Sequence, residues 1–211
     1  EVATTLGGRF FIYDAYPYSF REYLAAQQVN LEQHWMYDTV QRSQVKRHLN
    51  DYFYYGGLPE ILSFQNKRSM LSSLYQKIYL GDICARNNIK SDRVLNILIK
   101  KMAESVKQPL SFNRLKNVIV ATGAPISVPT TIDYVDYASD SWLILPMENE
   151  VGKLTEKEMQ KKYYFVDNGL LNLFLMNSET SLLENMVAVE LCRRFGKNNV
   201  FFLNAEKEID F

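Results

Sequence analysis

The stretch WLILPMENEVGKLTEKEMQKKYYFV, at residues 142–166, decides the fold. Its two ends, 142–147 and 163–166, are apolar runs rich in β-branched and aromatic residues, and a charged segment lies between them. Short apolar runs of this kind are typical of buried strands. The stretch therefore predicts two strands joined by a charged loop.

Three helical patterns precede this pair of strands. Apolar residues recur at helical spacing over 94–102 and 115–119, and Ser111 stands before the second pattern as an N-cap. Ser127 stands in the same way before a third pattern. Three helices followed by two strands are the succession of a winged helix, which we expect at residues 91–166.

The flanking segments predict an α+β chain that is predominantly helical. Residues 1–90 combine a short strand with several helices. Ser19 and Glu22 can begin one helix with a capping box, and Gly56 or Gly57 can end another as a glycine C-cap. Residues 167–211 begin with a helix that Asp167 can cap, and they continue with a longer helix and a β-hairpin. We therefore expect three segments, 1–90, 91–166 and 167–211.

The composition is that of a soluble globular protein. Among 211 residues, 24 basic side chains balance 24 acidic ones, so the chain lacks the net positive charge of a strong nucleic-acid binder. It has no run of about 18 apolar residues and no signal sequence, so we expect a cytoplasmic protein without membrane contact. Cys84 and Cys192 lie in apolar helical stripes and are expected to be buried free thiols.

The charge of the third helix argues against DNA binding. No lysine or arginine lies between Lys116 and Lys153. The acidic residues in that interval are Asp133, Asp136, Asp140, Glu148 and Glu150. A helix with this charge repels phosphate groups, and the mixed charges of the loop at 153–162 are typical of a solvated surface. We expect the winged helix to contact protein, with DNA binding as the disfavoured alternative.

Two carboxylates near the end of the chain form a candidate catalytic or metal-binding pair. Glu190 lies on the last helical pattern, and Asp210 lies on the closing strand. The stripe that we expect this helix to bury consists of Leu183, Val187, Leu191 and Phe195. If the helix packs on the polar face of the strand, Glu190 and Asp210 approach each other and favour a hard divalent cation. The alternative is an edge hairpin whose polar face meets water.

A series of motifs resembles, in the same order, a family of prokaryotic AAA+ ATPases. The strings that carry the resemblance are Gly7–Phe10, Tyr16–Leu24, Gly56–Glu60, Ile78–Arg86, Tyr164–Leu170, Glu184–Leu191 and Glu208–Phe211. Together they cover essentially the whole chain. Each motif is weak alone, and the shared order makes the resemblance specific.

The resemblance implies that the chain is a non-catalytic C-terminal fragment of such an ATPase. The ATP and Mg²⁺ sites would precede Glu1, so the fragment itself would hold no cofactor. Its partners would be the missing ATPase core and a protein bound through the winged helix. Arg9 is the residue that the resemblance places near the nucleotide.

The C-terminal domain of the family is of unknown function and is similar to the PD-(D/E)XK nuclease fold. By this resemblance, residues 167–211 would begin a nuclease-like α/β layer. A truncated metal-dependent nuclease, with Glu190 and Asp210 as its carboxylates, is therefore the alternative from the enzyme class.

Overall fold

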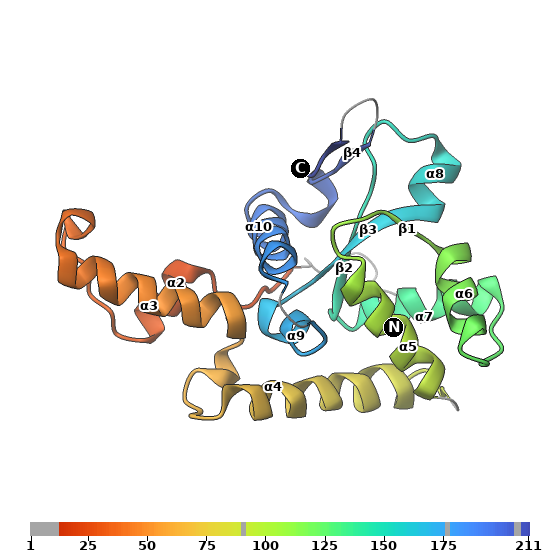
Figure 1. The fold of residues 1–211 in the computed structure, drawn as a ribbon, viewed down its shortest axis with the longest axis horizontal. Coiled ribbons are helices and arrows are strands. Elements are labelled where there is room, and N and C mark those ends of the chain that lie inside the picture. Colours follow the sequence, from red (N-terminus) through yellow and green to blue (C-terminus); the bar gives the residue numbers. More distant parts are fainter. Residues whose placement is uncertain (1–12, 90–91, 176–177, 205–207) are drawn as a thin grey trace, which may run out of the picture.

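The computed structural model describes residues 13–89, 92–175, 178–204 and 208–211 (Figure 1). The chain is mostly helical with a small three-stranded sheet, which confirms the α+β class. Arg9, the expected neighbour of a nucleotide, lies outside the described residues. Within the described ranges, no helix combines the length and the apolar character needed to cross a membrane.

An arm of helices projects at one end of the molecule, at the left of Figure 1. It consists of α2 (Phe20–Ala26), the 3₁₀ turn η1 (Trp35–Tyr37) and α3 (Thr39–Tyr55). Ser19 and Glu22 form a reciprocal capping box at the start of α2, as the sequence predicts. Gly56 ends α3 with a φ of 78°, a conformation that favours glycine, so the predicted glycine C-cap is confirmed.

A long continuous helix lies along the lower edge of the molecule in Figure 1. After the 3₁₀ turn η2 (Pro59–Ile61), α4 (Lys67–Gln76) continues into a π-helix, η3 (Lys77–Ala85). Asp82 and Arg86, four residues apart near the end of this helix, form no ion pair with each other.

The central unit is built around the small sheet. It contains α5 (Asp92–Glu104), β1 (Leu110–Ser111), α6 (Phe112–Ala121), α7 (Val128–Asp140), β2 (Ile144–Met147), α8 (Leu154–Met159) and β3 (Gln160–Phe165). The strands lie in the order β1-β3-β2, and β3 is antiparallel to both neighbours. Ser111 and Ser127 cap α6 and α7 as predicted. Strand β1 and helix α8, which lies within the charged loop, were not predicted.

The C-terminal segment packs beside this sheet. It contains α9 (Asn168–Asn172), α10 (Glu179–Phe195), the 3₁₀ turn η4 (Lys197–Asn199), β4 (Leu203–Asn204) and β5 (Glu208–Ile209). The expected buried stripe on α10 was wrong, since Leu183 is 52% exposed and Phe195 is 61% exposed. The face that α10 buries carries Leu182, Asn185, Ala188, Val189 and Cys192.

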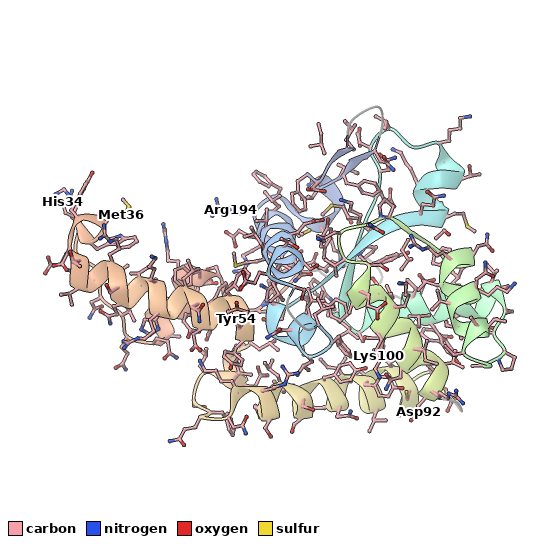
Figure 2. The ribbon with its side chains drawn as sticks, in the orientation of Figure 1. His34, Met36, Tyr54, Asp92, Lys100 and Arg194 are labelled. Carbon is pink, nitrogen blue, oxygen red and sulfur yellow. The ribbon has the colours of Figure 1, made fainter. Side chains whose placement is uncertain are left out.

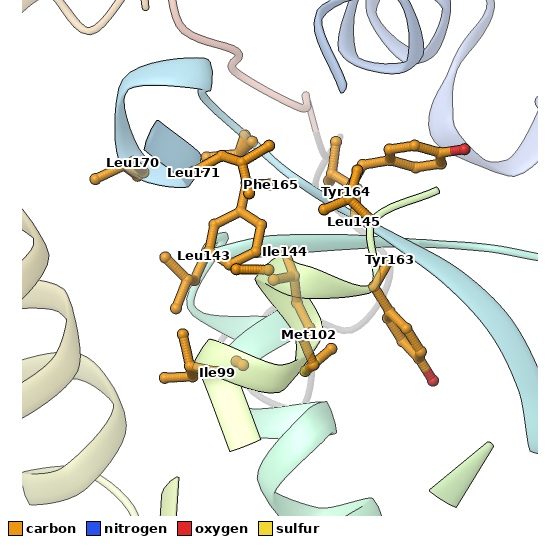
Figure 3. Close-up of a cluster of buried hydrophobic side chains, with 14 of the residues drawn as sticks. Ile99, Met102, Leu143, Ile144, Leu145, Tyr163, Tyr164, Phe165, Leu170 and Leu171 are labelled. Atoms are coloured by element: carbon orange, nitrogen blue, oxygen red, sulfur yellow. The ribbon is translucent and has the colours of Figure 1, made fainter. Parts of the chain in front are cut away.

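One hydrophobic cluster joins these parts. Figure 3 shows its centre, where Ile144 of β2 lies near Met102 of α5, and Phe165 of β3 lies near Leu171 of α9. The cluster contains residues of all three expected segments, whose boundaries stay a prediction. Cys84 and Cys192 are both buried free thiols, as expected.

Candidate functional site

A buried lysine lies where β3, α10 and the C-terminal hairpin meet. Lys162 of β3 is fully buried, and its Nζ lies 2.7 Å from Oδ1 of Asp210 and 3.5 Å from Oε1 of Glu184. Nζ also lies 5.5 Å from the centre of the Phe202 ring. Alternation along a strand places Lys162 and Tyr164 on the same face of β3, the face toward α10. The sequence interpretation of this lysine as part of a solvated loop was wrong.

Glu184 is the second carboxylate of this cluster. Tyr164 donates a hydrogen bond of 2.9 Å from its hydroxyl to Oε1 of Glu184. Burial raises the pKa of Glu184, and the hydrogen bond from Tyr164 and the charge of Lys162 oppose that rise. Burial also raises the pKa of Tyr164, with Glu184 as the next cause. The four groups Lys162, Tyr164, Glu184 and Asp210 are called the lysine cluster below.

The lysine cluster can anchor the hairpin to the sheet. A buried ammonium group needs charged partners, because an unpaired charge inside a protein is costly. Two carboxylates from different elements supply those partners here, and one of them stands at the end of the hairpin. The arrangement therefore couples the position of the hairpin to that of α10.

A second polar site joins the loop after α3 to the start of α9. Asp167 is buried and accepts hydrogen bonds from the backbone N–H groups of Gly57 at 2.7 Å and Gly169 at 2.8 Å. It also caps α9, which confirms the cap predicted from the sequence. Burial raises the pKa of Asp167 from 3.8 to about 6, and the N–H donors, Gly57 first, limit the rise.

Two buried asparagines extend this second site. Asn185 of α10 is fully buried and exchanges hydrogen bonds with the backbone N–H and C=O of Phe165 at 2.7 and 2.9 Å. Its Nδ2 also donates to Oδ1 of Asn168, and Asn168 donates to the carbonyls of Phe53 and Leu182. The sequence did not single out either asparagine. Both lie inside motifs of the family resemblance, Asn168 in the string at 164–170 and Asn185 in the string at 184–191, and this was the available sign of their importance.

Glu190 lies in a third setting, beside two arginines. Its Oε1 is 2.6 Å from Nε of Arg194, and its Oε2 is 3.7 Å from Nε of Arg193. Arg193 also lies 3.4 Å from Glu22 of the arm and packs over the ring of Tyr16. Glu190 and Arg193 help to line a cavity of about 20 Å³, the size of one water molecule.

The two carboxylates predicted from the sequence therefore contact different partners. Asp210 contacts Lys162 of the sheet, whereas Glu190 contacts the arginines of its own helix. Lys162, the partner of Asp210, is also contacted by an acidic residue of α10, but this residue is Glu184 and not Glu190. Over the part of the chain that the structure describes, no group of three or more metal-binding side chains occurs.

The acidic residues of α7 lie at the surface. Asp133, Asp136 and Asp140 are all exposed, and they fall at positions i, i+3 and i+7 of one helix face. None of the three forms an ion pair with another described residue. The opposite face of α7 buries Thr131, Val135 and Ala138 against the body.

Comparison with known proteins places the chain among uncharacterised relatives. It is 28% identical over 219 residues to an uncharacterised protein of Methanocaldococcus jannaschii and 30% identical over 217 residues to one of Haemophilus influenzae. Each alignment covers 100% of the chain, but only 49% and 52% of those proteins, so the chain spans about half the length of these relatives. No solved structure matches the chain.

A family model also matches the middle of the chain. The match extends over residues 46–181, which is more than half of the chain and includes residues 46–55 of α3, Asp167 and the whole central unit. The chain belongs to the family described as a domain of unknown function, DUF8612.

Proposed function

We propose that the chain is a non-catalytic coupling module of an AAA+-type ATPase and that the acidic face of α7 contacts a protein partner. The observation that carries this proposal is the exposed row of Asp133, Asp136 and Asp140, none of which forms an ion pair with a residue that the structure describes. The ATPase context comes from the series of motifs in the sequence. ATP and Mg²⁺ would bind a part of the protein outside these residues.

The order of elements in the central unit supports a winged helix. Its elements follow one another in the order α5-β1-α6-α7-β2-α8-β3. The sheet order β1-β3-β2 then makes β2 and β3 the hairpin of the wing, with α8 in its loop. In this arrangement α7 is the helix that a DNA-binding relative would place in the major groove.

Charge favours protein over DNA as the partner of α7. A helix that enters a major groove gains affinity from lysine and arginine near the phosphates, and α7 has neither. Within the wing, Lys161 is paired with Glu148 at 3.0 Å and with Glu158 at 3.5 Å. Lys161, which lines a groove together with residues of α7, is therefore already neutralised.

The coupling role can be tested by ATP hydrolysis in the complete gene product. We expect hydrolysis by the wild type and a change of about threefold or more in its rate when Asp133 and Asp140 are both replaced by lysine. The matched control replaces Glu60 and Asp82, exposed acids outside α7, by lysine and leaves the rate unchanged. Absence of hydrolysis, or equal rates in all three proteins, would refute the proposal.

A truncated nuclease is the second candidate, favoured by the convergence of Glu184, Lys162 and Asp210. Carboxylates and a lysine are the residue types with which PD-(D/E)XK nucleases are built. In this structure, however, the ammonium of Lys162 lies between the two carboxylates, where a divalent cation would have to displace it. Titration calorimetry with Mn²⁺ separates the candidates, because only a metal site gives a binding heat that Asp210→Ala abolishes.

A further inference from the structure

The tip of the arm carries a basic face with exposed apolar residues beside it. Arg42, Lys46 and Arg47 of α3 are exposed, and none of them forms an ion pair with another residue that the structure describes. No acidic residue occurs between Asp38 and Asp51. We call this surface, together with Tyr37 and Val40, the arm tip.

The apolar part of the arm tip is unusually exposed. Tyr37 is 85% exposed and Val40 is 76% exposed, and Met36 beside them is also exposed. Figure 2 shows His34 and Met36 at the far end of the arm, away from the body. Large apolar side chains gathered at the end of a projecting element are typical of a surface that another molecule covers.

A groove with the opposite charge lies at the other end of the molecule. It runs between α7 and the β3–α8 region, has a volume of about 230 Å³, and has apolar walls that include Ile132, Val135 and Met159. Asp136 and Glu158 also line it. Asp133 and Asp140 lie on the same face of α7 as Asp136. We call this surface the acidic groove.

The carboxylates of α7 at the acidic groove lie close to one another and repel each other. The pKa of Asp136 is raised, chiefly by burial and then by the charges of Asp140 and Asp133. The cation that lines the groove, Lys161, opposes this rise, but it is paired with Glu148 and Glu158. A cation from another molecule could therefore pair with Asp133, Asp136 or Asp140, none of which forms an ion pair with a described residue of this chain.

The two surfaces match in charge, spacing and shape. Arg42 and Lys46 are four residues apart on one helix, as are Asp136 and Asp140 on another, so each pair spans roughly 6 Å along its helix. The arm tip projects and the groove is concave, and the charges without an ion pair to a described residue are basic on the arm tip and acidic beside the groove. The chain therefore carries both a basic projecting surface and an acidic groove that can receive it.

We propose that the arm tip of one copy docks into the acidic groove of a second copy. The arm and α7 lie at opposite ends of the long axis, as Figure 1 shows, so a copy does not reach its own groove. Contacts between two different surfaces join copies head to tail, and they produce a ring where the rotation closes and a filament where it does not. This inference rests on the proposed role of α7 as a protein-contacting helix, and it names the partner.

The experiment is sedimentation velocity of the 211-residue chain at about 50 µM. In low salt we expect a weight-average mass above the monomer mass of 24.6 kDa, and a return to that mass at about 0.5 M salt, where charges are screened within a few ångströms. The arm variant, Arg42→Glu with Lys46→Glu, and the groove variant, Asp136→Lys with Asp140→Lys, should each be monomeric. An equimolar mixture of the two should associate again, because the acidic arm tip of the arm variant can dock into the basic groove of the groove variant.

Controls make the result specific to these surfaces. Lys100→Glu with Arg114→Glu changes the net charge as the arm variant does, at exposed positions outside both surfaces, and should leave the association unchanged. If a reversal variant loses its cooperative unfolding transition, Arg42→Gln with Lys46→Gln replaces it, with at least about tenfold weaker association expected.

Two outcomes would overturn the inference. One is a wild-type mass of 24.6 kDa in low salt at this concentration. The other is an unchanged mass in the arm variant together with loss of duplex DNA binding, which would assign the arm tip to nucleic acid. Neither outcome depends on ATP hydrolysis, so failure of the coupling role and failure of the docking are distinguishable.

Discussion

The backbone N–H of Gly57 donates a hydrogen bond of 2.7 Å to Oδ2 of Asp167, which lies 110 positions later in the chain. The bond ties the loop after α3 to the first turn of α9. A second bond, from the N–H of Tyr18 to the carbonyl of Gly57 at 2.8 Å, fixes the same loop to the start of α2. The arm is therefore attached to the body through hydrogen bonds of the Gly57 backbone, and the close neighbours of Gly57 leave almost no space for a side chain there.

Replacing these glycines by alanine should destabilise the protein. A Cβ at Gly57 would lie 2.3 Å from the carbonyl oxygen of Tyr18, and one at Gly169 would lie 2.1 Å from that of Tyr55. Because both neighbours are backbone, we expect each substitution to lower the free energy of unfolding by about 1–3 kcal/mol or more. Gly81→Ala is the control, since nothing lies within 4 Å of its Cβ, and urea denaturation should show it unchanged or slightly stabilised. Equal effects at Gly81 and Gly57 would contradict this packing.

The buried carboxyl of Asp167 should make stability depend on pH. Its pKa rises from 3.8 in the unfolded chain to about 6 in the folded state, so the folded state binds this proton more tightly. Its contribution is fully present below about pH 4 and is lost as the pH rises through about 6, which amounts to about 1–3 kcal/mol.

Asp167→Asn isolates that contribution. The variant keeps a similar shape but cannot titrate, so its free energy of unfolding should lack the fall between about pH 4 and 6 that the wild type shows. Glu22 and Glu184 titrate in both proteins and cancel in the difference. Urea midpoints measured across that range provide the comparison. Parallel profiles for the two proteins would show that Asp167 is charged throughout.

Removing the ammonium of the lysine cluster should be costly. In Lys162→Ala, Glu184 loses its cation while it stays mostly buried, and uncompensated charges of this kind cost about 3–5 kcal/mol. Lys101→Ala breaks a pair with Glu104 that is largely exposed and should cost less than about 1 kcal/mol. Thermal and urea unfolding of both variants measure the difference. A loss as small as that of Lys101→Ala would mean that the hairpin is not anchored through Lys162.

Truncating the buried asparagine of α10 should also destabilise the fold. Asn185 satisfies both backbone groups of Phe165, and Asn185→Ala would leave that N–H and C=O without partners in the core. Each buried polar group without a partner costs about 1–3 kcal/mol, so we expect a loss of several kcal/mol. Asn172→Ala is a milder comparison, because Asn172 is only half-buried and makes a single bond, to the carbonyl of Tyr54. Equal losses in urea denaturation would contradict the central place of Asn185.

Local signals in the sequence predicted the ends of helices well. The caps at Ser19, Ser111, Ser127 and Asp167 and the glycine end of α3 all depend on a few neighbouring residues, and the structure confirms them. The same holds for the two principal strands, whose apolar runs are bounded by charged or turn residues. Caps and turns are set by local hydrogen bonds, and they need no knowledge of the tertiary packing.

The orientation of α10 could not be predicted in this way. Both of its faces carry apolar side chains, with Leu182 and Val189 on one and Leu183 and Val187 on the other, so periodicity alone does not choose between them. Choosing the wrong face also selected Glu190 as the neighbour of Asp210, whereas the acidic residue of α10 that contacts Asp210's partner Lys162 is Glu184. The burial of Lys162 was hidden for a related reason, since the partners that neutralise it lie 22 and 48 positions away.

The claim that the acidic face of α7 contacts protein rather than nucleic acid is tested most directly by fluorescence anisotropy with labelled duplex DNA at about 150 mM salt. We expect no saturable binding below about 1 µM, because the helix lacks the cations that release counterions from DNA. A submicromolar dissociation constant that becomes smaller still when Asp133 and Asp136 are replaced by asparagine would place α7 against DNA and contradict the claim.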